Sequence, residues 1–354
     1  MKKIMMAALM MGATLGAQAQ NEWFQNVKFS GYGMAQYQAS DQDQKETNGF
    51  NLRLVRMALE GRAHEDFYWK VQMQINGNTY DPDNTAKTDI RLVDLFGEWQ
   101  KYEFFKVKAG QFKRPFTFEN PMHPITQGFM SYSQNVSKLA GFSDRCGGNA
   151  SNGRDIGVQI QGDFLKNAEG RNLLHYQVGA FNGEGINQKD KDNRKDIIGG
   201  LWVMPIKGMR IGAFGWTGSR AGVGEKNRYA LSGEYAANDW TFRTEYIHSQ
   251  GWNATQTSDK ADGIYALCIA PIQKNKIHVK ARYDLYREAD SWNGFINGAG
   301  TFVGGAKTMY EIGADYLFTK NLQINVEYAR VNDRTINSDK HNYNMVDVEL
   351  DFRF

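Results

Sequence analysis

The sequence predicts an all-β protein: a transmembrane, antiparallel up-and-down β-barrel of sixteen strands, with a long third extracellular loop folded inward. Three observations favour this fold. The chain begins with an export signal. Segments of about ten residues alternate apolar and polar side chains, as barrel strands do. After the signal, no uncharged apolar run approaches the roughly 18 residues of a membrane helix, so a membrane span would have to be a closed barrel.

The first 19 residues have the layout of a cleaved signal peptide. Lys2 and Lys3 precede an apolar stretch that is too short to span a bilayer, and Ala17-Gln18-Ala19 supplies the small residues of a cleavage site. We expect cleavage after Ala19 and a mature barrel of residues 20–354. The barrel prediction places this exported chain in the outer membrane of a Gram-negative-type cell.

Alternation defines the strands. In one clear segment Ile277, Val279 and Ala281 alternate with polar or charged residues. A half-buried strand of a soluble sandwich also alternates, but here the polar set is too polar for a buried layer. An even number of strands leaves both termini on the periplasmic side. The sixteen candidates begin near residues 27, 50, 67, 89, 104, 153, 173, 195, 209, 227, 240, 261, 276, 307, 321 and 343.

The connections alternate in length. Tight turns such as "AND" (237–239) and "TKN" (319–321) take turns with longer polar loops such as "NGEGINQKDKDN". Short periplasmic turns and long outer loops produce this pattern in membrane barrels.

The last segment, "VDVELDFRF", has an apolar face and a charged face. Closing a barrel requires the final strand to pair with the first, so that no edge exposes unpaired backbone to lipid. Leu350, Phe352 and Phe354 would then face the outer-membrane lipid. A terminal aromatic on such a strand resembles the signal that outer-membrane assembly machinery recognises, and we assign these three residues to it.

Residues 117–152 form the third outer connection and lack a strand pattern. A structureless connection this long is usually functional or disordered, and its apolar residues, among them Ile125 and Phe129, argue against disorder. We expect this loop to fold inward and narrow the lumen. The alternative is a loop that caps the outside.

Alternation also predicts the lumen lining. Lys106 and Lys108 on one strand, with Lys113 and Arg114 where that strand enters the long loop, form a basic series. This series favours weak anion selectivity, because charges at the narrowest point act most strongly. Arg53 and Arg56 have opposite parity, which indicates a β-bulge or an Arg53 near the interface. The other candidate lining residues are Arg56, Lys138, Arg145, Lys280, Arg282, Asp94 and Glu98.

Other function classes find little support. Without the signal lysines, Lys+Arg falls from 42 to 40 against 39 acidic residues, so no basic excess points to nucleic acid. The six histidines are scattered, so we expect neither metal nor cofactor. An outer-membrane hydrolase would need a Ser/His or Asp/His set at the rim. The hydrolase stays open as an alternative, as does a non-conducting structural or adhesive barrel. Whether Cys146 and Cys268 pair is also open.

Three stretches, "FNLRLVRMALEG", "AGQFKRPFTFEN" and "YQVGAFNGEG", stand in the order and spacing seen in a known family. The chain resembles the phosphate-selective porin O/P family over nearly its whole mature length. The resemblance implies a homotrimeric, sixteen-stranded outer-membrane channel for small solutes, with a constricting third loop. Family members that handle phosphate carry a ladder of arginines at the constriction. This loop offers only Lys138 and Arg145 beside Asp144, so the resemblance does not imply phosphate as the solute.

Overall fold

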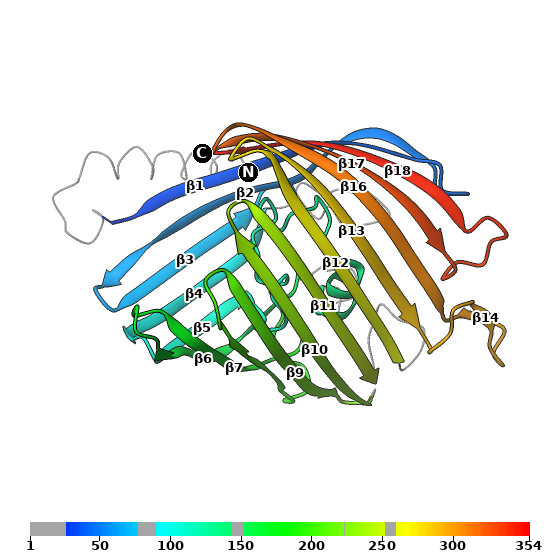
Figure 1. Cartoon of the computed structure of the whole chain (residues 1–354). Coiled ribbons are helices and arrows are strands. Elements are labelled where there is room, and N and C mark those ends of the chain that lie inside the picture. Colours follow the sequence, from blue (N-terminus) through cyan, green and yellow to red (C-terminus); the bar gives the residue numbers. More distant parts are fainter. Residues whose placement is uncertain (1–25, 77–89, 143–151, 223, 252–259) are drawn as a thin grey trace, which may run out of the picture.

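The computed structural model describes residues 26–76, 90–142, 152–222, 224–251 and 260–354. Sixteen antiparallel strands in this part of the chain close into a barrel, as the alternation predicted (Figure 1). The predicted signal peptide, residues 1–19, and also Arg145 and Cys146 lie outside the described residues. Cys268 is a free thiol on the wall.

The strands follow the chain around the barrel. A hairpin of β14 (Phe295–Ile296) and β15 (Phe302–Val303) lies in the outer connection that precedes β16, and α2 (Gln134–Leu139) lies in the long connection after β5. The wall consists of β1 (Lys28–Ser40), β2 (Thr47–His64), β3 (Phe67–Gln74), β4 (Arg91–Tyr102), β5 (Phe105–Lys113), β6 (Arg154–Lys166), β7 (Asn172–Phe181), β8 (Asp196–Val203), β9 (Met209–Arg220), β10 (Gly224–Ala237), β11 (Trp240–Gly251), β12 (Lys260–Gln273), β13 (Ile277–Glu288), β16 (Gly305–Thr319), β17 (Leu322–Asp333) and β18 (Asn342–Arg353).

The two faces of each strand are inverted relative to a soluble protein. On β13, Val279 is 41% exposed and Tyr283 37%, whereas Lys280 and Arg282 are 4% and 3% exposed. Apolar residues therefore cover the outside and charged residues the inside, which suits lipid around a polar interior. No helix in the described part of the chain is long and apolar enough to cross a membrane.

Short turns gather at one end of the barrel. Two residues separate β10 from β11 and β16 from β17, while the connections at the other end include the long segment between β5 and β6 (Figure 1). The start of β1 and the end of β18 lie at the short-turn end. In a membrane barrel the short turns are periplasmic, so the predicted orientation of the connections is consistent with the fold.

The seam joins β1 to β18, as predicted from the last segment. Tyr32 pairs with Arg353, and Gly31 exchanges two backbone hydrogen bonds with Phe354, of 2.9 and 3.0 Å. The Phe354 ring lies against Gly31, where a Cβ would come within 2.4 Å of it, so a larger residue there would displace the ring. Leu350, Phe352 and Phe354 face outward, with 39, 41 and 52% of their surface exposed.

A β-bulge on β2 explains how Arg53 and Arg56 face the same side of the barrel although they are three residues apart. Met34 pairs with Leu54 and Ala35 with Leu52, so Arg53 is the extra residue between them. Both Arg53 and Arg56 consequently reach the interior, and Arg53 forms an ion pair with Glu349 of β18 at 2.9 Å.

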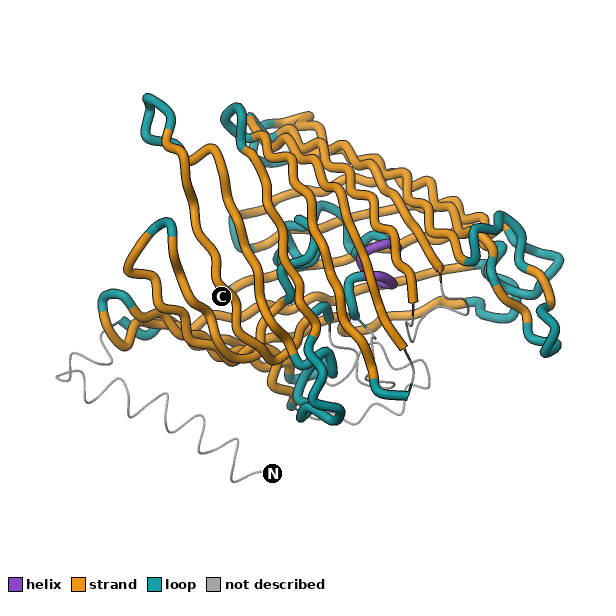
Figure 2. The backbone as a smooth tube through the Cα atoms, turned by 90° about the horizontal axis from the view of Figure 1, so that it is seen from below, coloured by secondary structure: helices purple, strands orange, loops and turns teal. Residues whose placement is uncertain are grey.

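The connection between β5 and β6 is packed rather than extended. Its α2 contacts β11, β12 and β13, and Figure 2 shows this helix within the outline of the barrel. Phe116, Phe118, Val136 and Leu139 join one buried cluster with Trp216 and other interior residues of the wall. Burial of these side chains stabilises the segment by roughly 1.5–3 kcal/mol each.

Candidate functional site

Basic residues of the inner wall hold the long connection by its carbonyl groups. Arg243 donates to the carbonyl oxygen of Gln127 at 2.8 Å. Lys280 donates to that of Gly128 and Arg282 to that of Ser131, each at 2.9 Å. Hydrogen bonds to charged groups contribute about 1.5–3 kcal/mol each, so these contacts fix the segment against β11 and β13.

Acidic residues of the same wall bind its N–H groups. Glu245 accepts the backbone N–H groups of Phe118 and Glu119, at 2.9 and 2.8 Å. Glu327 accepts that of Met130 at 2.9 Å, and Asp284 that of Gln134 at 2.8 Å. Wall charges of both signs are therefore used to satisfy loop backbone that would otherwise lose its hydrogen bonds on burial.

The basic residues that hold the loop are also paired with acids across the wall. Arg243 and Glu234 lie 2.5 Å apart, Lys280 and Glu327 2.6 Å, and Arg282 and Glu311 2.5 Å. The predicted lining residues Lys280 and Arg282 thus belong to neutralised pairs. Little of their charge is left for a passing solute.

Two lysines of β5 are paired with acids as well, and a third is held by carbonyl groups of the long connection. Lys106 lies 3.6 Å from Asp163 and Lys108 3.7 Å from Glu98. Lys113 donates to the carbonyl oxygens of Asn120 and Met122, at 2.6 and 2.9 Å.

Arg114, next in the series, forms a 2.8 Å ion pair with Asp155, and neither side chain is exposed. This placement differs from the expected open series, because the long segment folds back over its own start.

Two further predicted residues have local partners. Asp94 of β4 binds Arg154 of β6 at 2.6 Å, across β5. Sequence reasoning missed Arg154, although it is inward-facing at the first position of its strand. Lys138 of α2 lies over the Tyr286 ring at 4.7 Å, and burial, assisted by Lys307, lowers the pKa of its ammonium group.

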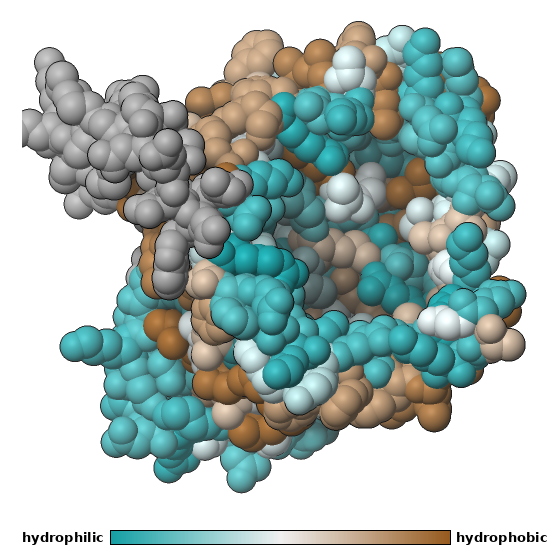
Figure 3. Space-filling view, turned by 90° about the vertical axis from the view of Figure 1, so that its left-hand side faces the viewer, coloured by the Kyte–Doolittle hydropathy of each residue, from teal (hydrophilic) through white to brown (hydrophobic). Residues whose placement is uncertain are grey.

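A polar cavity of about 460 Å³ opens at the short-turn end of the barrel, where Figure 3 shows the molecule hollowed and largely hydrophilic. Its wall comes from β1, β2, β3, β18 and the turn after β16, and His123 of the long connection reaches it. Its five basic residues are Lys28, Arg56, Lys70, Lys320 and Arg353, and Glu60 is its acidic side chain. Of these, only Arg56 was singled out as a candidate for the functional site.

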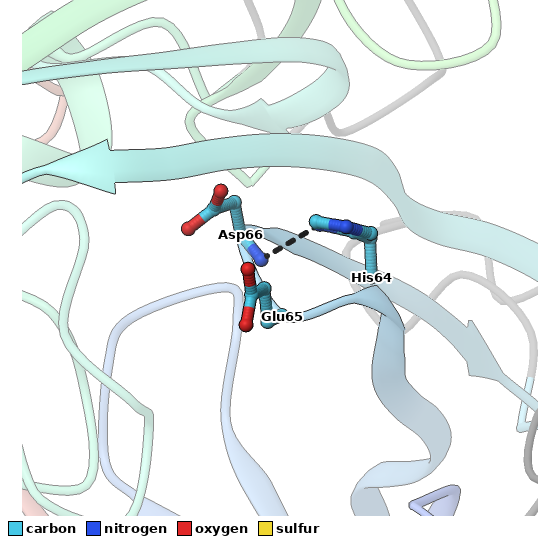
Figure 4. A group of neighbouring side chains, drawn as sticks. All are labelled: His64, Glu65 and Asp66. Carbon is cyan, nitrogen blue, oxygen red and sulfur yellow. Dashed lines mark hydrogen bonds between the residues drawn. The ribbon is translucent and has the colours of Figure 1, made fainter.

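A possible metal-binding group lies on the turn between β2 and β3. His64, Glu65 and Asp66 offer ligand atoms within 4.8 Å of one another. Figure 4 shows their side chains spreading apart, with the Nδ1 atom of His64 accepting the backbone N–H of Asp66 at 3.3 Å. These three residues do not form a preorganised metal site, because the turn is exposed and the Nδ1 atom of His64 already accepts a hydrogen bond.

Comparison with known proteins supports the fold and the family. Residues 29–192 match the family model described as phosphate-selective porin O and P. No curated protein matches the chain.

Solved structures of similar fold include three named porins or outer-membrane proteins. The anion-selective porin from Comamonas acidovorans is 12% identical, with a TM-score of 0.63, and the match covers 93% of this chain and 99% of that one. Salmonella typhi OmpF in complex with daunomycin is 12% identical, with a TM-score of 0.65 and coverage of 93% and 98%. Pseudomonas putida OprB is 9% identical, with a TM-score of 0.69 and coverage of 93% and 94%. At such identities the likeness shows the fold alone.

Proposed function

We propose that this chain, whose residues 29–192 match the model of the phosphate-selective porin O and P family, is a passive outer-membrane channel with a weak preference for anions. Its solutes are small and hydrophilic, and phosphate is one anion that such a channel would pass. The polar interior and the apolar exterior support the channel.

The charge of the cavity is the observation that carries the anion preference. The long connection is fastened to β11, β13 and β17, and its Ile125 and His123 also pack on Tyr32 of β1. Among the described residues of this connection, His123 is the one that lines the cavity. We place the open passage at this cavity, which β1, β2, β3 and β18 line. Five basic residues face that passage, and fixed positive charge in a narrow channel raises the local concentration of anions.

The proposal includes a homotrimeric state and an assembly signal on the last strand. A homotrimer is the state that the family resemblance implies. We retain Leu350, Phe352 and Phe354 as the signal for the outer-membrane assembly machinery, because all three are displayed on the lipid face of the last strand.

A reversal-potential measurement in planar bilayers under a KCl gradient tests the function. We expect chloride to be preferred, and the double variant Arg56→Gln/Lys70→Gln to move the reversal potential towards that of a non-selective channel. The matched control Lys106→Gln/Lys108→Gln, which removes two cations already paired with acids, should move it less. Absence of conductance would instead favour the non-conducting barrel or the hydrolase. Cation preference in the parent protein would contradict the proposed selectivity.

A further inference from the structure

In the part of the chain that the structure describes, Arg56 is held at the cavity by hydrogen bonds to neutral partners. Its side chain is 2% exposed, its Nε donates to Gln74 at 3.1 Å, and its Nη1 donates to the Tyr32 hydroxyl at 3.1 Å. Both partners are neutral, so they orient the guanidinium without neutralising it. The Asp94 carboxylate also interacts electrostatically with Arg56, but it is itself paired with Arg154. A buried cation with neutral partners is a strong attractor for an anion.

Two neutral donors adjoin this charge. The Tyr32 hydroxyl oxygen accepts the Arg56 N–H, so its own proton points elsewhere. The His123 ring packs on Tyr32 with centroids 4.5 Å apart, and its Nδ1 lies 3.2 Å from the backbone N–H of Ile125. Burial, together with nearby Arg353, lowers the pKa of His123 to about 3. The neutral ring accepts at Nδ1, so it carries its proton on Nε2 and can donate from there.

The remaining cations exceed the local acids. Lys28 and Lys70 share Glu60, at 3.7 and 3.8 Å, so one carboxylate serves two ammonium groups. Lys320 and Arg353 line the same cavity beside the seam. Five basic side chains thus face Glu60 and the carboxylate of the chain end at Phe354, which leaves the cavity positive.

The size and the other lining groups point to more than an inorganic ion. The volume of about 460 Å³ lies within the range of about 300–1,000 Å³ found for pockets that hold organic ligands. Ser30, Gln72 and Asn321 add neutral hydrogen-bonding groups beside the cations. Such groups suit hydroxyls, because each can both donate and accept.

We propose that this cavity binds a small organic oxyanion: a phosphate or carboxylate group carried on a hydroxyl-bearing body of about monosaccharide size. Arg56, Lys70 and Arg353 would bind the anionic group, with Tyr32 and His123 as donors, and the neutral side chains would bind the hydroxyls. The inference rests on the proposed channel function and names its solute class.

Block of the KCl current through single channels tests the site. Glucose 6-phosphate and gluconate should each interrupt the current at lower concentration than inorganic phosphate, and neutral glucose should act only weakly. Block by glucose 6-phosphate alone would assign the site to phosphate esters, and block by gluconate alone to carboxylates. Arg56→Gln should weaken the block about tenfold or more, since it removes a charge-assisted hydrogen bond. The control Lys106→Gln, at the same end of the lumen, should leave it unchanged.

Two results would contradict the proposed site. The first is block by inorganic phosphate at the same concentration as the sugar derivatives. The second is unchanged block in Arg56→Gln, provided that the variant is folded, which faster gel migration before boiling than after it would show. If none of the probes blocks while the chloride preference persists, the site fails and the channel function stands. If the probes block without any chloride preference, the site stands and the proposed selectivity fails.

Discussion

At the scale of the residue, buried ion pairs organise the interior. Asp155 of β6 receives the Arg114 guanidinium and also accepts the backbone N–H groups of Gly183 and Gly185, at 2.8 and 3.3 Å. A single carboxylate therefore ties the long connection to the next outer one. Desolvating two charges is unfavourable, and removing one partner leaves the other buried and uncompensated.

We predict that Asp155→Asn lowers the free energy of unfolding by about 3–5 kcal/mol, because Arg114 would remain charged and buried. Equilibrium unfolding by urea in lipid vesicles measures the change. The control is Lys166→Gln at the 2.6 Å pair with Glu103, whose side chains are 55 and 48% exposed. An exposed pair contributes about 1 kcal/mol or less, so equal losses in the two variants would contradict the prediction.

At the scale of the element, the strands could be predicted from sequence and the path of the long connection only in part. Alternation is local: the strands expected near residues 27 and 343 begin at Lys28 and Asn342. The partners of charged residues depend on which strands adjoin across the barrel, as for Asp94 and Arg154, which are 60 residues apart. That is why the expected basic residues on and after β5 could be identified from the sequence, but not the partners that occupy them.

The last strand carries the second prediction, which concerns assembly. Phe354→Ala should reduce the amount of folded protein in the outer membrane more than it reduces the stability of the barrels that form, if the terminal aromatic acts as a recognition signal. Quantitative blotting of membrane fractions gives the yield, and thermal loss of the fast gel form gives the stability. Phe318→Ala is the control, because Phe318 is 54% exposed and Phe354 52%. A normal yield with lowered stability in Phe354→Ala would show that Phe354 acts only by packing, which contributes about 1–3 kcal/mol to the free energy of unfolding.

At the scale of the whole molecule, closure removes every sheet edge from the wall. Each of the sixteen strands has two hydrogen-bonded neighbours, including β1 and β18 at the seam. Backbone groups in hydrocarbon have no water to bind, so a membrane-spanning sheet satisfies all of its backbone groups only by closing.

Closure predicts resistance to detergent. Unheated protein should migrate faster on a denaturing gel than boiled protein, because the compact barrel persists until heat breaks its cooperative hydrogen bonding. Circular dichroism of the same samples should show strand content before boiling and its loss afterwards. Identical migration, together with solubility in the absence of detergent, would contradict a membrane barrel.

The seam also sets an order of events in time. Gln36 and Asp347, hydrogen-bonded across it, are 311 residues apart, whereas most other neighbouring strands meet through short connections. Because the entropy of joining two points rises with the length of chain between them, hairpins form early and the seam forms late. Until the seam closes, the growing sheet has two edge strands with unpaired backbone groups: β1 and the strand that was added last. We expect a synthetic peptide with the β18 sequence to pair with β1 in place of the protein's own β18, and so to stop the barrel from closing.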